Sequence, residues 1–250
     1  MIHITGKEFA DKCKADVCLT QSRSRNGKKY HNKYTELLGK LGYSGINKNG
    51  VFTKRYSYGV VGHCCIGVQY WLIKCGLEAF VPKKGYIWNT NNYAKWLKSK
   101  PLIGGYGKVG WTSDIKKAKT GDIIFKGSKK EKSYSHTCVF IKYEKGYVYT
   151  VDFNVTGKKN GKKYNNGLVF KRKASSYRWG VAHMPYPVKY TVNTKNSPLN
   201  IRKSPSTTGE IAITLKKGTA IYVTSIVNDW ANVVGPVKGF CSAKYIKKFS

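Results

Sequence analysis

Residues 56–77 read YSYGVVGHCCIGVQYWLIKCGL. Glycines punctuate the first part of this segment, and an almost wholly apolar run then extends from Cys64 to Gly76. A helix that is apolar nearly all round is buried, and a glycine favours the C-terminal end of a helix. The pattern therefore predicts a central, buried helix that carries two cysteines, Cys64 and Cys65, in its first turn.

The position of these two thiols has two interpretations. The N-terminus of a helix presents unpaired N–H groups and the positive end of the helix dipole. A thiol placed there loses its proton more easily, and the thiolate is the nucleophile of covalent catalysis. Free cysteines are also among the most buried residues of protein cores. This segment alone leaves a catalytic and a core role open for both thiols.

A predicted β-hairpin supplies the residues that a thiol nucleophile needs. Residues 135–141 and 147–152 are rich in apolar and β-branched residues and flank a turn at Lys145-Gly146. His136 opens the first strand, and Asp152 and Asn154 stand at the end of the second. An imidazole can take the thiol proton and later protonate a leaving amine. A carboxylate or amide on its far nitrogen fixes the tautomer.

The cysteine segment resembles the nucleophile helix of the papain-like peptidoglycan hydrolases, the NlpC/P60 and CHAP group. With Cys64 as the nucleophile, Val68, Gln69 and Tyr70 occupy the matching positions, whereas Cys65 gives a poorer register. Gly67 departs from the pattern, because the family usually has an aromatic residue there.

Two later segments resemble the same group, in the same order along the chain. Residues 121–125, Gly-Asp-Ile-Ile-Phe, resemble its Gly-Asp strand, and Ser135-His136 resembles the start of its histidine strand. Asp152-Phe153-Asn154 resembles the Glu-Gly-Asn element of CHAP domains, with Phe153 in place of the glycine.

The resemblance implies a role for each matching residue. Cys64 would be the nucleophile, and its backbone N–H would bind the oxyanion. His136 would be the base, and Asp152 and Asn154 would orient it. Tyr56, in a short Tyr-x-x-Gly element before the cysteines, would line the site. No metal site or cofactor is expected, and the remaining histidines, among them His183, are interpreted as incidental.

A second domain is predicted after a proline linker at 184–189. Residues 190–250 alternate in short segments between Gly and Pro turns, which is typical of a small β-barrel. They resemble bacterial SH3 domains, whose implied role is to bind the cell wall. The candidate wall contacts are Arg202, Tyr222, Trp230, Phe240 and Tyr245.

Charge and cysteine content narrow the function classes. The chain has 46 Lys+Arg against 12 Asp+Glu, a formal net charge of +34. Such a field attracts polyanions: nucleic acid, an anionic membrane surface or an acidic cell wall. The basic residues are spread along the chain, which disfavours a dedicated nucleic-acid-binding arm. Seven cysteines with no C-x-x-C pair do not form a disulfide scaffold pattern.

We therefore expect an α+β fold: helices packed on an antiparallel sheet over 1–183, followed by a small all-β barrel. The expected activity is cysteine-dependent cleavage of an amide bond of peptidoglycan, by an amidase or an endopeptidase. The combination resembles a phage endolysin, made in the cytoplasm without a signal peptide and acting as a monomer on peptidoglycan and anionic wall polymers.

The alternatives are a bacterial autolysin or secreted lytic effector, a catalytically inactive wall-binding protein, and a basic nucleic-acid-binding protein. The last interpretation rests on charge alone.

Overall fold

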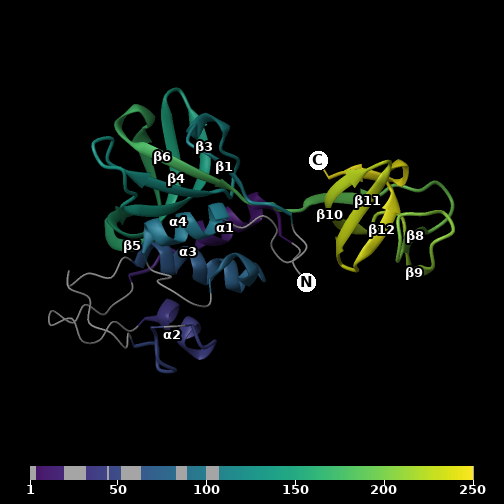
Figure 1. Cartoon of the computed structure of the whole chain (residues 1–250), viewed down its shortest axis with the longest axis horizontal. Helices are drawn as coiled ribbons and strands as arrows, with labels where there is room; N and C mark the ends of the chain where they lie inside the picture. Colours follow the sequence, from purple (N-terminus) through teal and green to yellow (C-terminus); the bar gives the residue numbers. More distant parts are fainter. Residues whose placement is uncertain are drawn as a thin grey trace. The chain divides into compact units, whose positions relative to one another are not determined.

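The computed structural model describes residues 4–19, 32–43, 45–51, 63–82, 89–99 and 107–249. The chain divides into two compact units (Figure 1). The large unit comprises Gly6–Ile103 and Lys108–Met184, and the small unit is centred on Pro185–Ser250. None of the helices in the described ranges combines the length and the apolarity that crossing a bilayer requires.

The large unit packs helices against one antiparallel sheet of six strands, in the order β1-β6-β2-β3-β4-β5. Figure 1 shows α1, α3 and α4 gathered on one side of this sheet. The helices are α1 (Gly6–Ala15), α2 (Lys33–Lys40), α3 (His63–Lys74) and α4 (Thr90–Ser99). The strands are β1 (Gly110–Thr112), β2 (Ile123–Gly127), β3 (His136–Glu144), β4 (Tyr147–Lys159), β5 (Lys162–Lys173) and β6 (Arg178–His183). The predicted α+β class is confirmed.

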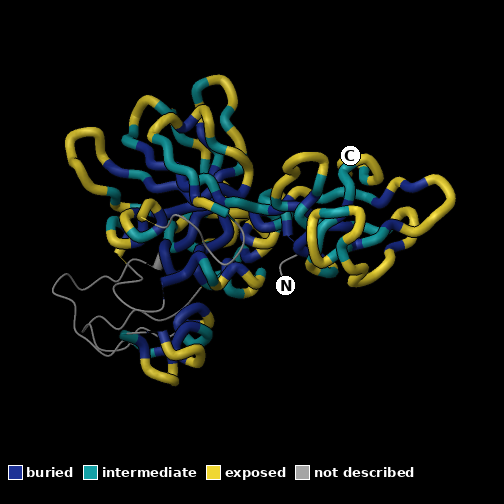
Figure 2. The backbone as a smooth tube through the Cα atoms, turned by 45° about the vertical axis from the view of Figure 1, so that its right-hand side comes forward, coloured by how far each residue is buried: buried dark blue, intermediate teal, exposed yellow. Residues whose placement is uncertain are grey.

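The central helix α3 is buried as its apolar sequence predicts. Its residues Ile66, Val68 and Leu72 are fully shielded from solvent, and the helix packs against β3 and β4. It ends at Lys74, and Gly76 just beyond it has a φ of 70°, the left-handed conformation that glycine adopts without steric cost. In Figure 2 the buried backbone of this unit is concentrated where the helices meet the sheet.

A buried carboxylate joins the first three helices. Asp16, directly after α1, accepts hydrogen bonds from the Tyr34 hydroxyl at 2.9 Å and the Trp71 indole N–H at 2.8 Å, and it forms an ion pair with Lys33. Tyr34 and Lys33 belong to α2 and Trp71 to α3, so this one side chain fixes both helices relative to the end of α1. The helices α1 and α2 therefore contribute to the core of the large unit.

Asp122 of the Gly-Asp element has a comparable structural role. Its carboxylate accepts the backbone N–H groups of Lys119 and Met184 and lies 2.7 Å from Nδ1 of His183. These bonds tie the start of β2 to the end of β6. His183, which the sequence analysis interpreted as incidental, has a structural contact with Asp122 that its local sequence pattern does not indicate.

The small unit is a seven-stranded antiparallel sheet around its own core, in the order β13-β7-β10-β11-β12-β8-β9. The strands are β7 (Val188–Val192), β8 (Leu199–Arg202), β9 (Ile211–Leu215), β10 (Ala220–Val227), β11 (Trp230–Gly235), β12 (Gly239–Ser242) and β13 (Ile246–Lys248). The strand β7 begins inside the range predicted as linker. Val188 and Lys189 pair with Val223 and Tyr222 of β10, which makes them part of the sheet.

Candidate active site

The first turn of α3 holds the two thiols in different environments. Cys64 is buried, and a hydrogen bond from the neighbouring Cys65 thiol is the largest influence that lowers its pKa. Burial opposes this effect, but His136 and the backbone of Thr137 lower the pKa further. The pKa of the Cys64 thiol is therefore well below its ordinary value. Cys64 therefore carries the thiolate character that a nucleophile requires.

The pKa of the Cys65 thiol is shifted in the opposite direction. Its thiol is fully buried and lies 3.1 Å from the Thr137 hydroxyl and 3.5 Å from the Thr90 hydroxyl. Burial, followed by the proximity of Cys64, raises the pKa of Cys65 well above its ordinary value. The two cysteines are adjacent in sequence, yet one is an activated thiol and the other a protonated core residue.

His136 is the first residue of β3 and connects the thiol to a carboxylate. Its Nε2 lies 2.6 Å from Oδ2 of Asp152 on β4. Burial alone would lower the pKa of His136, but the hydrogen bonds to Asp152 and Cys64 outweigh it and raise the pKa to about 9. The imidazole is therefore protonated at neutral pH, between a thiolate on one side and a carboxylate on the other.

Asp152 accepts three hydrogen bonds from two residues besides His136. Arg172 on β5 donates from Nη2 to Oδ2 at 2.7 Å and from Nη1 to Oδ1 at 3.1 Å, and the Thr150 hydroxyl donates to Oδ1 at 2.6 Å. Burial would raise the pKa of Asp152, but His136 and Arg172 together hold it below its ordinary value. The carboxylate is thus fully buried and ionised, with both oxygens occupied.

Arg172 is a site residue that the sequence analysis missed, because it lies in the basic run Lys171-Arg172-Lys173. The strand register pairs Arg172 with Val148 and Phe170 with Thr150, which puts Arg172 on the same face as Asp152. The alternation of side chains along a strand could have indicated it. Arg172 falls on the buried face of a predicted strand, where an unpaired charge is rare.

The remaining predicted residues lie elsewhere. Asn154 adopts a φ of 59°, and its backbone N–H donates to Oδ1 of Asn166 at 3.2 Å. In the described part of the chain the structure records no hydrogen bond between the Asn154 side chain and His136. Tyr56 lies outside the described residues.

Gly67 and Phe153, which both depart from the family pattern, are in direct contact. A Cβ placed on Gly67 of α3 would lie 2.4 Å from the ring of Phe153 on β4, which is fully buried. The ring of Phe153 therefore fills the space into which a side chain at position 67 would project. The aromatic group is supplied by the strand, and the glycine on the helix makes room for it.

His136, Cys138 and Asp152 offer ligand atoms within 4.8 Å of one another, which is close enough for a metal ion. The donor set does not suit one. The Arg172 guanidinium occupies the same carboxylate and would repel a cation, and burial raises the pKa of the Cys138 thiol well above its ordinary value. A cysteine binds a metal ion only as the deprotonated thiolate, so a protonated Cys138 is a poor ligand. The geometry supports an acid–base role for this cluster.

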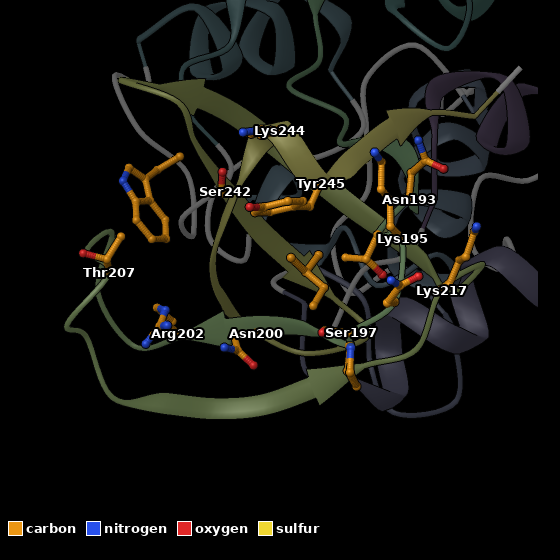
Figure 3. A pocket seen from close by; sticks show the side chains of 15 residues that line it. Asn193, Lys195, Ser197, Asn200, Arg202, Thr207, Lys217, Ser242, Lys244 and Tyr245 are labelled. Carbon is orange, nitrogen blue, oxygen red and sulfur yellow. The ribbon is translucent and has the colours of Figure 1, made fainter.

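In the small unit, three of the five candidate wall contacts line one pocket: Arg202, Trp230 and Tyr245 (Figure 3). The other two are placed in the sheet and do not line that pocket. Tyr222 on β10 pairs with Lys189 and Gly235, and Phe240 on β12 pairs with Asn232 and Arg202.

Comparison with known proteins identifies the small unit. Residues 197–247 match the family model of the bacterial SH3 domain. The crystal structure of Ly7917 is 16% identical, with a TM-score of 0.30 over 72% of this chain and 83% of that chain. Ly7917 with the hydrolyzing product of MDP is 14% identical, with a TM-score of 0.25 over 62% and 67%. NlpC2 from Trichomonas vaginalis is 8% identical, with a TM-score of 0.23 over 51% and 44%.

No curated protein matches the chain. The structural similarities have TM-scores too low to carry an argument about the large unit. The match to the bacterial SH3 domain covers residues 197–247 of the small unit and none of the large unit.

Proposed function

We propose that this chain is a peptidoglycan hydrolase that cleaves an amide bond with Cys64 as the nucleophile. The observation that carries the proposal is the arrangement of Cys64, His136 and Asp152, in which an activated thiol, an imidazole and an ionised carboxylate follow one another. The bacterial SH3 domain at 197–247 and the net charge of +34 support a cell-wall substrate.

The chemistry follows from these three groups. The Cys64 thiolate attacks the amide carbonyl carbon, and the resulting oxyanion is stabilised by the backbone N–H of Cys64 at the start of α3. The His136 imidazolium gives its proton to the leaving amine as the C–N bond breaks, which leaves a thioester on Cys64.

Neutral His136 then removes a proton from water, and the hydroxide attacks the thioester. Collapse of the second tetrahedral intermediate breaks the C–S bond and restores the thiolate and the imidazolium. The carboxylic acid product is released and loses its proton to solvent. Asp152 holds the ring by its Nε2, so that Nδ1 is the nitrogen left to serve the sulfur and the substrate.

The finer assignment is a phage endolysin that acts on a Gram-positive wall. It is supported by the pairing of one thiol hydrolase unit with one wall-binding unit in a single chain. The cleaved bond would be either the muramoyl–alanine amide or an amide of the stem or bridge peptide, since both require the same thiol chemistry. Mass spectrometry of the released muropeptides distinguishes these two bonds.

The alternative of an inactive wall-binding protein rested on Gly67 and Phe153. Their mutual packing accounts for both departures without any loss of the catalytic groups. We therefore favour the active enzyme.

The test is lysis of purified Gram-positive walls, followed by turbidity and by the release of new amino groups. We expect Cys64→Ser to abolish lysis while wall binding remains, because serine is a far poorer nucleophile in this setting. Cys65→Ser is the matched variant: its hydroxyl can still donate a hydrogen bond to Cys64, so it should keep activity, with some loss of stability because it buries a hydroxyl in place of a thiol.

Iodoacetamide should label Cys64 first in the native protein, since its pKa is the lower of the two. If Cys65→Ser is inactive and Cys64→Ser lyses walls normally, the nucleophile has been misassigned. If neither substitution reduces amino-group release, the enzyme proposal is wrong.

A further inference from the structure

The small unit contains a groove of about 830 Å³ that the proposed hydrolysis does not use. It is bounded by the 193–200 segment, β8, and the residues that follow β12 (Figure 3). Apart from Leu199, which lines the groove and also belongs to the apolar core of the unit, its lining residues lie outside that core. The groove is therefore an open surface feature with room for several units of a chain molecule.

The charged residues of the groove are all of one sign. Lys195, Arg202, Lys217 and Lys244 line it, and its lining includes no Asp or Glu. One acidic residue close in sequence, Glu210, lies 2.6 Å from Lys203, which is outside the lining. This charge favours an anionic ligand, because negative groups in the groove would meet complementary positive charge along its length.

The basic residues are spread along the groove. In Figure 3, Arg202 lies at one end of the lining, Lys195 and Lys217 lie at the other, and Tyr245 lies between them. Arg202 is held in place, since its Nη1 donates to the carbonyl oxygen of Gly209 at 2.6 Å. This spacing suits a ligand with anionic groups repeated along a chain better than a single small anion.

Two aromatic side chains also line the groove. Trp230 is half-buried, and Tyr245 is 42% exposed despite its size. An exposed ring gives a flat apolar surface at little conformational cost, on which the C–H groups of a sugar or polyol can pack. The alternation of cation, aromatic ring and cation matches a polymer in which polyol units alternate with phosphodiesters.

We propose that this groove binds a phosphodiester-linked polyol chain of the bacterial cell wall. The proposal rests on the wall-directed function above and names the wall component that the SH3 domain recognises. Poly(glycerol phosphate) is the simplest polymer of this chemistry, and it serves as the probe.

The experiment measures binding of the full chain to poly(glycerol phosphate) by isothermal titration calorimetry near physiological salt. The test variant is Lys195→Gln with Lys217→Gln. The matched control is Lys247→Gln with Lys248→Gln, which removes the same charge from exposed lysines of the same unit outside the groove. Glycerol 3-phosphate and a single-stranded DNA with an equal number of phosphates are the competitors.

We expect the groove variant to bind the polymer about threefold to thirtyfold more weakly, as the loss of two exposed ion contacts predicts. The control variant should bind like the parent chain. Glycerol 3-phosphate should compete poorly, because one phosphate cannot occupy both ends of the groove.

Three outcomes would overturn the proposal. Equal weakening by both variants would mean that only the overall charge matters. Equal binding of DNA with the same dependence on the groove lysines would assign the groove to nucleic acid. Undiminished binding of the groove variant, together with full binding to walls stripped of their anionic polymers, would assign recognition to the peptide or glycan.

The unaltered chain should still release amino groups from stripped walls. That measurement tests the hydrolase proposal on its own, whichever result the polymer gives.

Discussion

At the scale of single residues, the protonation state of His136 should set the pH range of activity. Its pKa of about 9 and the lowered pKa of Cys64 place a thiolate–imidazolium pair at neutral pH. As the pH rises through about 9, the imidazolium loses the proton that the leaving amine needs. We expect kcat/KM on a soluble muropeptide to be flat through neutrality and to fall with an apparent pKa near 9.

The variant Asp152→Asn provides the check on this assignment. It removes the negative charge that helps to raise the pKa of His136, so the alkaline fall should begin at lower pH. An alkaline limb that does not move in this variant would show that His136 is not the titrating group.

A second residue-scale prediction concerns the groups around His136. Asp152→Ala should reduce kcat about 10²- to 10⁴-fold, because the imidazole loses the partner that orients it. Asn154→Ala should cost less, since the recorded hydrogen bond of Asn154 comes from its backbone N–H. If Asn154→Ala is the more damaging of the two, the orienting residue has been misassigned.

Arg172 acts through Asp152 and is a positioning residue. Arg172→Gln should destabilise the fold by about 3 kcal/mol, because it leaves a buried carboxylate without its cation. It should also shift the alkaline limb of the pH profile, which a purely structural role would not do. Arg172→Lys should rescue only part of both effects, because an ammonium cannot reproduce the two-point contact with the carboxylate.

The sequence predicted Cys64, His136 and Asp152 through their resemblance to family motifs. The second strand of the predicted hairpin was expected to end near Asp152, but β4 continues to Lys159, so Asp152 and Asn154 lie inside it. Arg172 was not predicted because its role depends on the pairing of β5 with β4, and a local pattern does not specify that register. The contact between His183 and Asp122 was not predicted for the same reason, because it depends on the pairing of strands in the sheet.

At the scale of elements, Gly67 on α3 and Phe153 on β4 should behave as one unit. Gly67→Ala would improve helix propensity by about 1 kcal/mol. Its Cβ would, however, lie 2.4 Å from the Phe153 ring and also crowd the base of that side chain. Overpacking of this kind costs about 1–3 kcal/mol or more, so we expect a net loss in the free energy of unfolding.

A double-mutant cycle measures the coupling. Phe153→Gly alone should cost about 3–5 kcal/mol by opening a cavity, and Gly67→Phe alone should be poorly tolerated. The double variant should be more stable in urea unfolding than the sum of the two single losses predicts. Strict additivity would show that the two positions do not share one space.

The helices illustrate how far a local pattern reaches. The buried α3 follows from its continuous apolar run, and the sequence predicted it. The way α1 and α2 dock onto α3 did not follow, because it depends on Asp16, which meets Lys33, Tyr34 and Trp71 only in the folded chain.

At the scale of the whole molecule, the small unit should fold and bind walls by itself when it is cut correctly. A fragment of residues 185–250 retains β7, whereas one of residues 190–250 lacks Val188 and Lys189, which pair with β10. We expect the longer fragment to unfold cooperatively and to pellet with intact walls without lysing them. The shorter fragment should be less stable in urea by the loss of these pairs.

Salt provides a control for the binding of the longer fragment. Residues 185–250 contain ten basic and two acidic residues, so wall binding should weaken as ionic strength rises. A soluble, folded 185–250 fragment that stays in the supernatant at low salt would contradict the targeting role.

The pairing of β7 with β13 has a consequence for protein engineering. Val192 pairs with Ile246, and the N–H of Phe249 donates to the carbonyl of Lys189 at 3.0 Å, so the chain enters and leaves the small unit at neighbouring points. A unit with adjacent ends can be grafted into a surface loop of a carrier protein without stretching the host. The same closeness suits circular permutation and tandem duplication, which would raise avidity for a repetitive wall surface.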